Sequence, residues 1–235
     1  SHGSHVAGTV GAVGNNSLGV TGIAQNVSIM ALKFLGLDGG TASDAIIAFQ
    51  YVIDMKQRGV NIKITQNSWG SQSFNQALLD VMNEAGALGI LHFAAAGNSG
   101  VDNDVTPHYP SSFDSPYVIA VAASDHNDVR ASFSCYGSQS VDLTAPGTNI
   151  LSTELGNTYA IKNGTSMATP MVSGIAALIA GLPANYNSAQ IRRILLNSVD
   201  SLSAWDSLVA TGGRANAYNS LMNDGSTSTL LILGP

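Results

Sequence analysis

The stretch Asn163-Gly164-Thr165-Ser166-Met167-Ala168-Thr169-Pro170 places one serine among small residues, directly before the apolar run of residues 171–179. The apolar run predicts a helix, so Ser166 stands at a helix N-terminus. Unpaired backbone N–H groups and the positive end of the helix dipole lie at such a position. Both favour negative charge on or near the serine oxygen, which suits a nucleophile in acyl transfer. An ordinary helix N-cap is the alternative for this stretch taken alone.

Two further motifs precede this stretch in the chain. The first is Ser1-His2-Gly3-Ser4-His5-Val6-Ala7-Gly8, and the second is Ala94-Ala95-Ala96-Gly97-Asn98-Ser99-Gly100. Taken in this order, the three motifs resemble those of the subtilisin-like serine proteases, the subtilases. The resemblance extends over about residues 1–222. Its small departures are Ser4, where the family usually carries Thr, and Met171, where it usually carries His.

The resemblance implies a serine endopeptidase that hydrolyses peptide bonds through an acyl-enzyme on Ser166. His2 would be the general base, since a histidine pKa near neutrality allows it to accept and return a proton. Asn98 would stabilise the oxyanion together with the backbone N–H of Ser166. An ordinary turn asparagine after a strand is the alternative for Asn98.

The family's catalytic Asp is missing from the motifs. In the family it lies on a strand upstream of the histidine, whereas here all acidic residues, from Asp38 to Asp224, follow His2. We therefore expect a partial catalytic domain over residues 1–222 with little or no turnover, and a linker or frayed tail over residues 223–235. A catalytically inactive pseudoprotease or peptide-binding module is the alternative. A structural calcium-binding surface domain is a third hypothesis.

The histidines bear on two other kinds of hydrolase. His2 and His5 have a His-x-x-His spacing, but zinc would need a third ligand and would block the base, so we expect His5 to be a buried, hydrogen-bonded residue. Gly164-x-Ser166 is similar to the nucleophile elbow of α/β-hydrolases, whose histidine follows the serine. No histidine follows Ser166, which excludes that class. The five histidines are His2, His5, His92, His108 and His126.

The pattern of elements predicts one α/β domain. With 235 residues, 45% of them hydrophobic, the chain can bury a sizeable core. Alternating strands and helices predict a three-layer α/β/α fold with a mostly parallel sheet, subtilisin-like but lacking its N-terminal part. We expect strands over residues 27–34, 62–66, 90–96, 117–123 and 141–143, a hairpin over 149–154 and 157–161, and helices over 43–58, 75–88, 166–181, 188–197 and 214–222.

Composition excludes several partners. A net charge of −6 without a basic run argues against nucleic acid. No apolar run approaches the ~18 residues that cross a bilayer. The single Cys135 allows no internal disulfide and is expected to be a small packed residue. The resemblance implies polypeptide substrates, an N-terminal pro-segment in the full-length protein, a monomer, and an extracellular or secretory location.

The resemblance also implies a substrate cleft. Ser68-Trp69-Gly70 and Ala95-Ala96-Gly97 correspond to the two edges of the P1 pocket, and would pair with an extended substrate backbone. His108 corresponds to the pocket floor, where many family members carry a very small residue. We expect its imidazole to shorten the pocket, disfavouring large aromatic P1 residues and admitting acidic ones below its pKa.

Calcium is the cofactor that the resemblance implies. Residues 13–20 resemble the family's calcium loop, in which carbonyls and an Asn side chain bind a hard cation. An ordinary Gly/Asn turn is the alternative for this loop. Asp125 is a candidate for a second, weaker cation site, with a plain surface charge as its alternative. The expected ligands in the loop are Val13, Asn15, Asn16, Leu18 and Val20.

Overall fold

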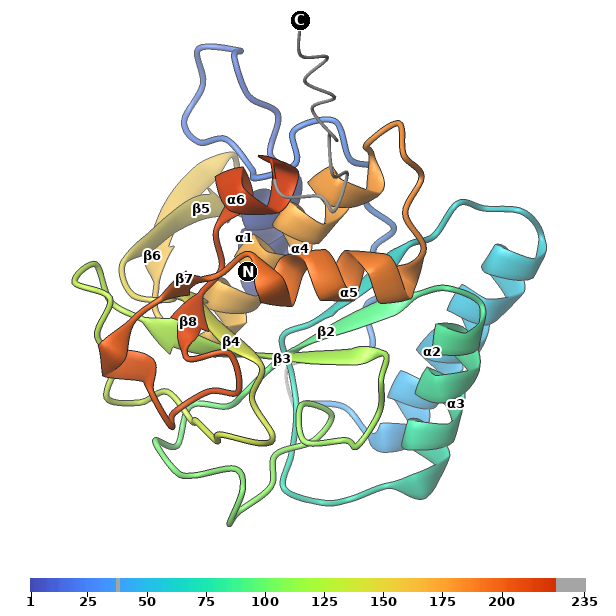
Figure 1. Ribbon diagram of the computed structural model, residues 1–235. Helices are drawn as coiled ribbons and strands as arrows, with labels where there is room; N and C mark the ends of the chain where they lie inside the picture. Colours follow the sequence, from blue (N-terminus) through green and yellow to red (C-terminus); the bar gives the residue numbers. More distant parts are fainter. Residues whose placement is uncertain (37–38, 223–235) are drawn as a thin grey trace, which may run out of the picture.

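The computed structural model describes residues 1–36 and 39–222, and a six-stranded sheet runs through its middle (Figure 1). The sheet is parallel except for β7, which pairs antiparallel with β8 at one edge. This confirms the predicted mostly parallel sheet. The predicted tail, residues 223–235, lies outside the described residues. In spatial order the strands are β1 (Ile64–Asn67), β2 (Leu91–Ala95), β3 (Val118–Ser124), β4 (Leu143–Pro146), β8 (Gly213–Arg214) and β7 (Asp200–Ser201).

The central strands β2 and β3 are buried along their whole length, as expected of parallel strands covered on both faces. Because successive side chains point to opposite faces, Phe93 and Val121 pack in the core under α4 (Thr165–Ala180) and α5 (Ser188–Asn197). Ala94 and Val118 belong to a second core, under α2 and α3. Separate cores under helices on the two faces of one sheet confirm the predicted three-layer fold.

Helices form both outer layers (Figure 1). Those of the first layer pack on α4, whose contacts extend to β1, β2, β3 and β4, and those of the second pack on each other. No helix within the described residues is long and apolar enough to cross a membrane. The first layer holds α1 (His2–Gly11), α4 (Thr165–Ala180), α5 (Ser188–Asn197) and α6 (Ala217–Met222), and the second holds α2 (Ala42–Gln57) and α3 (Gln76–Ala87).

Local signals explain where these helices begin. Thr41 and Asp44 exchange side-chain and backbone hydrogen bonds as a capping box at the start of α2. Asn187 and Gln190 do the same for α5, which begins and ends as predicted. Asn75 caps α3 through its side chain.

The predicted hairpin forms a separate two-stranded sheet of β5 (Ile150–Glu154) and β6 (Thr158–Lys162). Its turn includes Gly156 and Asn157, both with positive φ. The hairpin contacts α1 and leads directly into the segment before α4. It therefore contacts the helix that carries His2 and directly precedes the helix that carries Ser166.

Two predictions about elements were wrong. Residues 27–34 form no strand, because β1 pairs only with β2 among the described residues and offers this segment no hydrogen-bonded neighbour. Its apolar side chains Ile29 and Met30 are exposed as a result. The helix predicted over 214–222 begins only at Ala217, because Arg214 pairs with both β4 and β7.

Candidate active site

Ser166 is the second residue of α4, in the first turn of the helix. Its backbone N–H therefore has no acceptor within the helix, as the sequence predicted. Gly164 is the N-cap, with a φ of 148° that residues with a side chain rarely adopt. The serine thus stands at the positive end of a 16-residue helix.

A proline inside α4 leaves the backbone carbonyl of Ser166 free to bond Ser68, which follows the last residue of β1. Pro170 has no N–H, so it cannot bond the carbonyl of Ser166 four residues earlier. The hydroxyl of Ser68 donates to that carbonyl instead, at 2.8 Å. In return, the Oγ of Ser166 donates to the carbonyl of Ser68 at 3.4 Å. This reciprocal pair places a predicted substrate-binding residue directly beside Ser166, the predicted nucleophile.

Asn98 is held by Thr165, a fully buried residue. The Oδ1 of Asn98 accepts the backbone N–H of Thr165 at 2.9 Å and its hydroxyl at 3.0 Å. The same hydroxyl accepts the N–H of Gly97 at 3.2 Å. Because both donors bind Oδ1, the Nδ2 of Asn98 is left to face the other way. The sequence identified Asn98 but not Thr165, whose role depends on a contact 67 residues away along the chain.

The space in front of Gly164 is bordered by two potential donors. A Cβ at Gly164 would lie 3.5 Å from Asn98 Nδ2, 3.6 Å from the backbone nitrogen of Ser166 and 3.7 Å from Asn98 Oδ1, which already accepts two hydrogen bonds from Thr165. Two nitrogen atoms that can donate hydrogen bonds, one from a side chain and one from the backbone, therefore border this space. Such a pair of donors is what stabilisation of an oxyanion requires.

His2 is the exposed first residue of α1, and α1 packs against α4. Partial desolvation lowers the pKa of His2, and the positive charge of Lys162 lowers it further. A lowered pKa keeps the imidazole neutral and able to accept a proton near pH 7. Within residues 1–36 and 39–222, no hydrogen bond joins His2 to Ser166 or to a carboxylate.

His5 is fully buried and hydrogen-bonded, as predicted. Its Nε2 lies 3.0 Å from the carbonyl of Ile150 and 3.0 Å from that of Ala160. Two carbonyl acceptors at one nitrogen leave no room for zinc there. The described part of the chain also holds no cluster of three or more His, Cys, Asp or Glu that could bind a metal.

The two predicted edges of the P1 pocket meet at His108. A Cβ at Gly70 would overlap its imidazole, and one at Gly97 would lie 3.2 Å from its Cδ2. The Nδ1 of His108 is 3.2 Å from the Oγ of Ser111. Burial lowers the pKa of His108, and a hydrogen bond with the carbonyl of Ala95 opposes this shift. The ring is thus fixed between both edges.

The other predicted pocket residues differ in exposure. Ala95 and Ala96 are buried as whole residues, so neither presents its side chain to a substrate. Trp69 is half-buried, and its ring packs edge-on against Phe34 with centroids 5.0 Å apart. These contacts make Trp69 a part of the core under α2 and α3.

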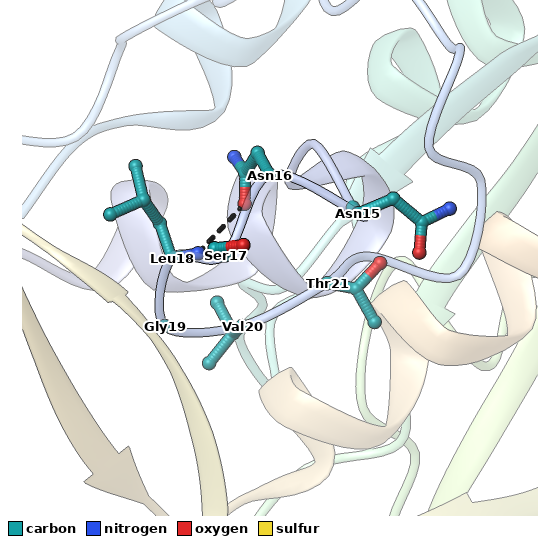
Figure 2. A pocket seen from close by; sticks show the side chains of 8 residues that line it. Asn15, Asn16, Ser17, Leu18, Gly19, Val20 and Thr21 are labelled. Carbon is teal, nitrogen blue, oxygen red and sulfur yellow. Dashed lines mark hydrogen bonds between the residues drawn. The ribbon is translucent and has the colours of Figure 1, made fainter.

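The predicted calcium loop surrounds a surface hollow of ≈ 340 Å³ lined by residues 14–21 (Figure 2). Asn15 and Ser17 have positive φ, so the chain turns tightly here. The Oδ1 of Asn16 accepts the N–H of Leu18 at 3.1 Å. The oxygen atoms that could bind a cation here belong to backbone carbonyls, side-chain amides and hydroxyls. Such oxygens suit Ca²⁺, but residues 14–21 contain no carboxylate.

Asp125 organises a turn. One carboxylate oxygen accepts the backbone N–H groups of Asn127 at 2.8 Å and Val129 at 3.0 Å. These bonds lower the pKa of Asp125. They give the side chain a structural role that does not depend on a cation.

Comparison with known proteins places these features in a family. A family model described as the Subtilase family matches residues 1–224. Subtilisin BL of Lederbergia lenta is 42% identical over 202 residues, which cover 86% of this chain and 71% of that protein. Subtilisin Savinase of the same organism is 41% identical over the same shares. M-protease of Shouchella clausii (strain KSM-K16) is 39% identical over 93% of this chain, which spans 52% of that relative.

Proposed function

The chain belongs to the subtilase family, and we propose that it is a serine endopeptidase acting on polypeptides through Ser166. The observation that carries this proposal is the space in front of Gly164, bordered by Asn98 Nδ2 and the N–H of Ser166. That space lies beside a serine at a helix N-terminus. The combination serves acyl transfer and has no evident use in a structural domain.

In the proposed mechanism, His2 removes the proton of Ser166 as the Oγ attacks the scissile carbonyl. The carbonyl oxygen becomes an oxyanion and accepts hydrogen bonds from Asn98 Nδ2 and the Ser166 N–H. His2 then returns the proton to the leaving amine, and water releases the acyl group in a second, equivalent cycle. The lowered pKa of His2 favours the neutral imidazole that the first step needs.

We expect slow turnover from this chain. A carboxylate normally orients the catalytic histidine, and its loss lowers turnover about 10⁴-fold in enzymes of this type. None of the described carboxylates is hydrogen-bonded to His2. Peptide binding without turnover is the alternative function.

A peptidyl diphenyl phosphonate tests the proposal, because it phosphonylates an activated serine even when turnover is slow. Mass spectrometry should locate the label on Ser166, and Ser166→Ala should remove it. His2→Ala should slow labelling at least tenfold. Binding of the same peptide without labelling would support the peptide-binding function instead, and efficient peptide hydrolysis by this chain would contradict the expected slow turnover.

We propose in addition that His108 shortens the P1 pocket, which disfavours large aromatic P1 residues and admits acidic ones below the pKa of His108. Its imidazole is held against Gly70 and Gly97 by bonds to Ser111 and Ala95, so it cannot swing aside without breaking them. Phosphonates with Ala, Glu, Phe or Tyr at P1 test this. The Ala phosphonate should label the parent chain fastest. The labelling rate of the Glu phosphonate relative to that of the Ala phosphonate should rise as the pH falls. His108→Gly should raise the labelling rates of the Phe and Tyr phosphonates relative to Ala. A preference of the parent for Phe or Tyr would contradict the proposal.

Calcium and the remaining partners are also proposals. The oxygen donors of residues 13–20 fit Ca²⁺, and Val13, Asn15, Asn16, Leu18 and Val20 would hold it. Bound Ca²⁺ would stabilise the loop that follows α1. By family resemblance we propose polypeptide substrates, a pro-segment in the full-length protein, an extracellular location and a monomer.

A further inference from the structure

We propose that the β5–β6 hairpin positions the general base relative to the nucleophile, an inference that rests on the proposed function. The hairpin pairs with no strand of the central sheet in the described parts of the chain. Each of its strands is linked to a different helix. β5 lies against α1, and β6 leads through residues 163–164 into α4. One small element thus bonds the helix of His2 and directly precedes the helix of Ser166.

Side chains of β5 bond the first turns of α1 at consecutive residues. The hydroxyl of Thr153 donates to the carbonyl of Ser4 at 2.8 Å. The hydroxyl of Ser152, which is 1% exposed, donates to the carbonyl of His5 at 2.7 Å. These carbonyls lie two and three residues after His2, so the bonds act within one helical turn of the base.

His5 is a side chain of α1 that bonds the backbone of the hairpin. Its Nε2 lies within hydrogen-bond distance of one carbonyl on each strand, Ile150 on β5 and Ala160 on β6. Since both partners are acceptors, Nε2 carries the proton, and the buried Nδ1 has no hydrogen-bond partner among the described residues. All hydrogen bonds of the His5 ring within the described residues therefore go to the hairpin.

α1 and β5 pack so closely that neither can shift far relative to the other. A Cβ at Gly8 would overlap the hydroxyl oxygens of both Thr153 and Ser152. The helix backbone consequently lies directly on β5. A displacement of about 1 Å at a reacting group can cost about 100-fold in rate, so such contacts can determine activity without touching the substrate.

The test compares Thr153→Val, which removes the hydroxyl at nearly constant shape, with Thr153→Ser, which keeps it. Thr158→Val is the matched control, because its hydroxyl bonds Leu155 in the turn of the same hairpin and has no bond to α1. Labelling with an alanine P1 phosphonate at increasing concentration separates the maximal labelling rate from the half-saturating concentration. Melting temperatures of all variants report folding.

We expect Thr153→Val to lower the maximal labelling rate about tenfold with an unchanged half-saturating concentration, since the substrate edges are untouched. Thr153→Ser and Thr158→Val should stay within twofold of the parent. Ser152→Ala gives a second, independent loss if Thr153→Val fails to fold. Equal maximal rates in Thr153→Val, Ser152→Ala and the parent would overturn this inference alone. A parent chain that is never labelled at Ser166 would overturn the proposed function.

Discussion

At the residue scale, Gly164 does two things at once: it adopts a φ of 148° and leaves the space between the two proposed oxyanion donors open. Gly164→Ala should therefore strain the backbone by about 1–3 kcal/mol and place a methyl group in that space. We expect phosphonate labelling of Ser166 to slow at least 100-fold, the order of effect of losing oxyanion stabilisation.

Gly156→Ala is the matched control for this substitution. Gly156 also has a positive φ, of 78°, but a Cβ there would meet no atom within 4 Å. It should lower the free energy of unfolding by a similar amount and leave the labelling rate unchanged. If both variants slow labelling equally, the effect of Gly164→Ala comes from lost stability and the space has no special role.

His92 gives the fold a dependence on pH. Burial lowers its pKa to about 4, and its ring nitrogens bond the hydroxyl of Thr65 and the carbonyl of Met82, both at 2.8 Å. The unfolded chain binds this proton near pH 6.5, so the free energy of unfolding should fall between pH 6.5 and 4 by about 3 kcal/mol. Below pH 4 this contribution stays constant.

Urea unfolding at pH 7 and pH 4.5 checks this expectation by comparing the parent with His92→Gln, which cannot titrate. The variant should lose less stability on acidification than the parent. His126→Gln, at an exposed histidine, is the control and should behave like the parent. A parent and a His92→Gln variant with the same acid sensitivity would show that other groups control it.

At the element scale, the bond between Ser68 and α4 exists because Pro170 frees a carbonyl. Ser68→Ala should leave the carbonyl of Ser166 unsatisfied and cost about 1 kcal/mol. In a Pro170→Ala background the new N–H can bond that carbonyl, so Ser68→Ala should then cost almost nothing. Urea unfolding of the four proteins gives the coupling energy, and additive effects would contradict this explanation.

The elements also show what local signals can predict. The helix over 188–197 was predicted correctly because its polar caps and its apolar side lie within its own sequence. The strand over 27–34 was wrong, since a strand needs a partner and apolar alternation alone does not supply one. The start of α6 was wrong for the converse reason, because distant strands recruit Arg214 into the sheet.

At the scale of the whole molecule, the sequence predicted the three-layer fold and the order of its motifs, but not how the motifs support one another. Asn98 was recognisable from its motif. The hydrogen bonds that Thr165 donates to Asn98 were not, because they form only when two distant segments meet in space. The same is true of Thr153 and Ser4, which lie 149 residues apart. Contacts between distant segments are set by topology, so a linear pattern does not contain them.

Calcium should act on the stability of the entire fold, since its proposed loop follows α1 directly and α1 packs on α4. Residues 14–21 offer neutral oxygen donors, so we expect weak binding, with a Kd of about 1 mM. At 10 mM Ca²⁺ such a site contributes about 1.4 kcal/mol, which raises the melting temperature of a chain this long by about 4 °C.

The melting temperature with and without Ca²⁺ checks this, with equal Mg²⁺ as the control for ionic strength. Asn16→Ala removes a proposed ligand and should abolish most of the Ca²⁺ shift. Asp125→Asn should keep the shift, because the Asp125 carboxylate already accepts two backbone N–H groups and lies in another turn. An equal shift with Mg²⁺ would mean general screening. Loss of the shift in Asp125→Asn but not in Asn16→Ala would move the site to Asp125.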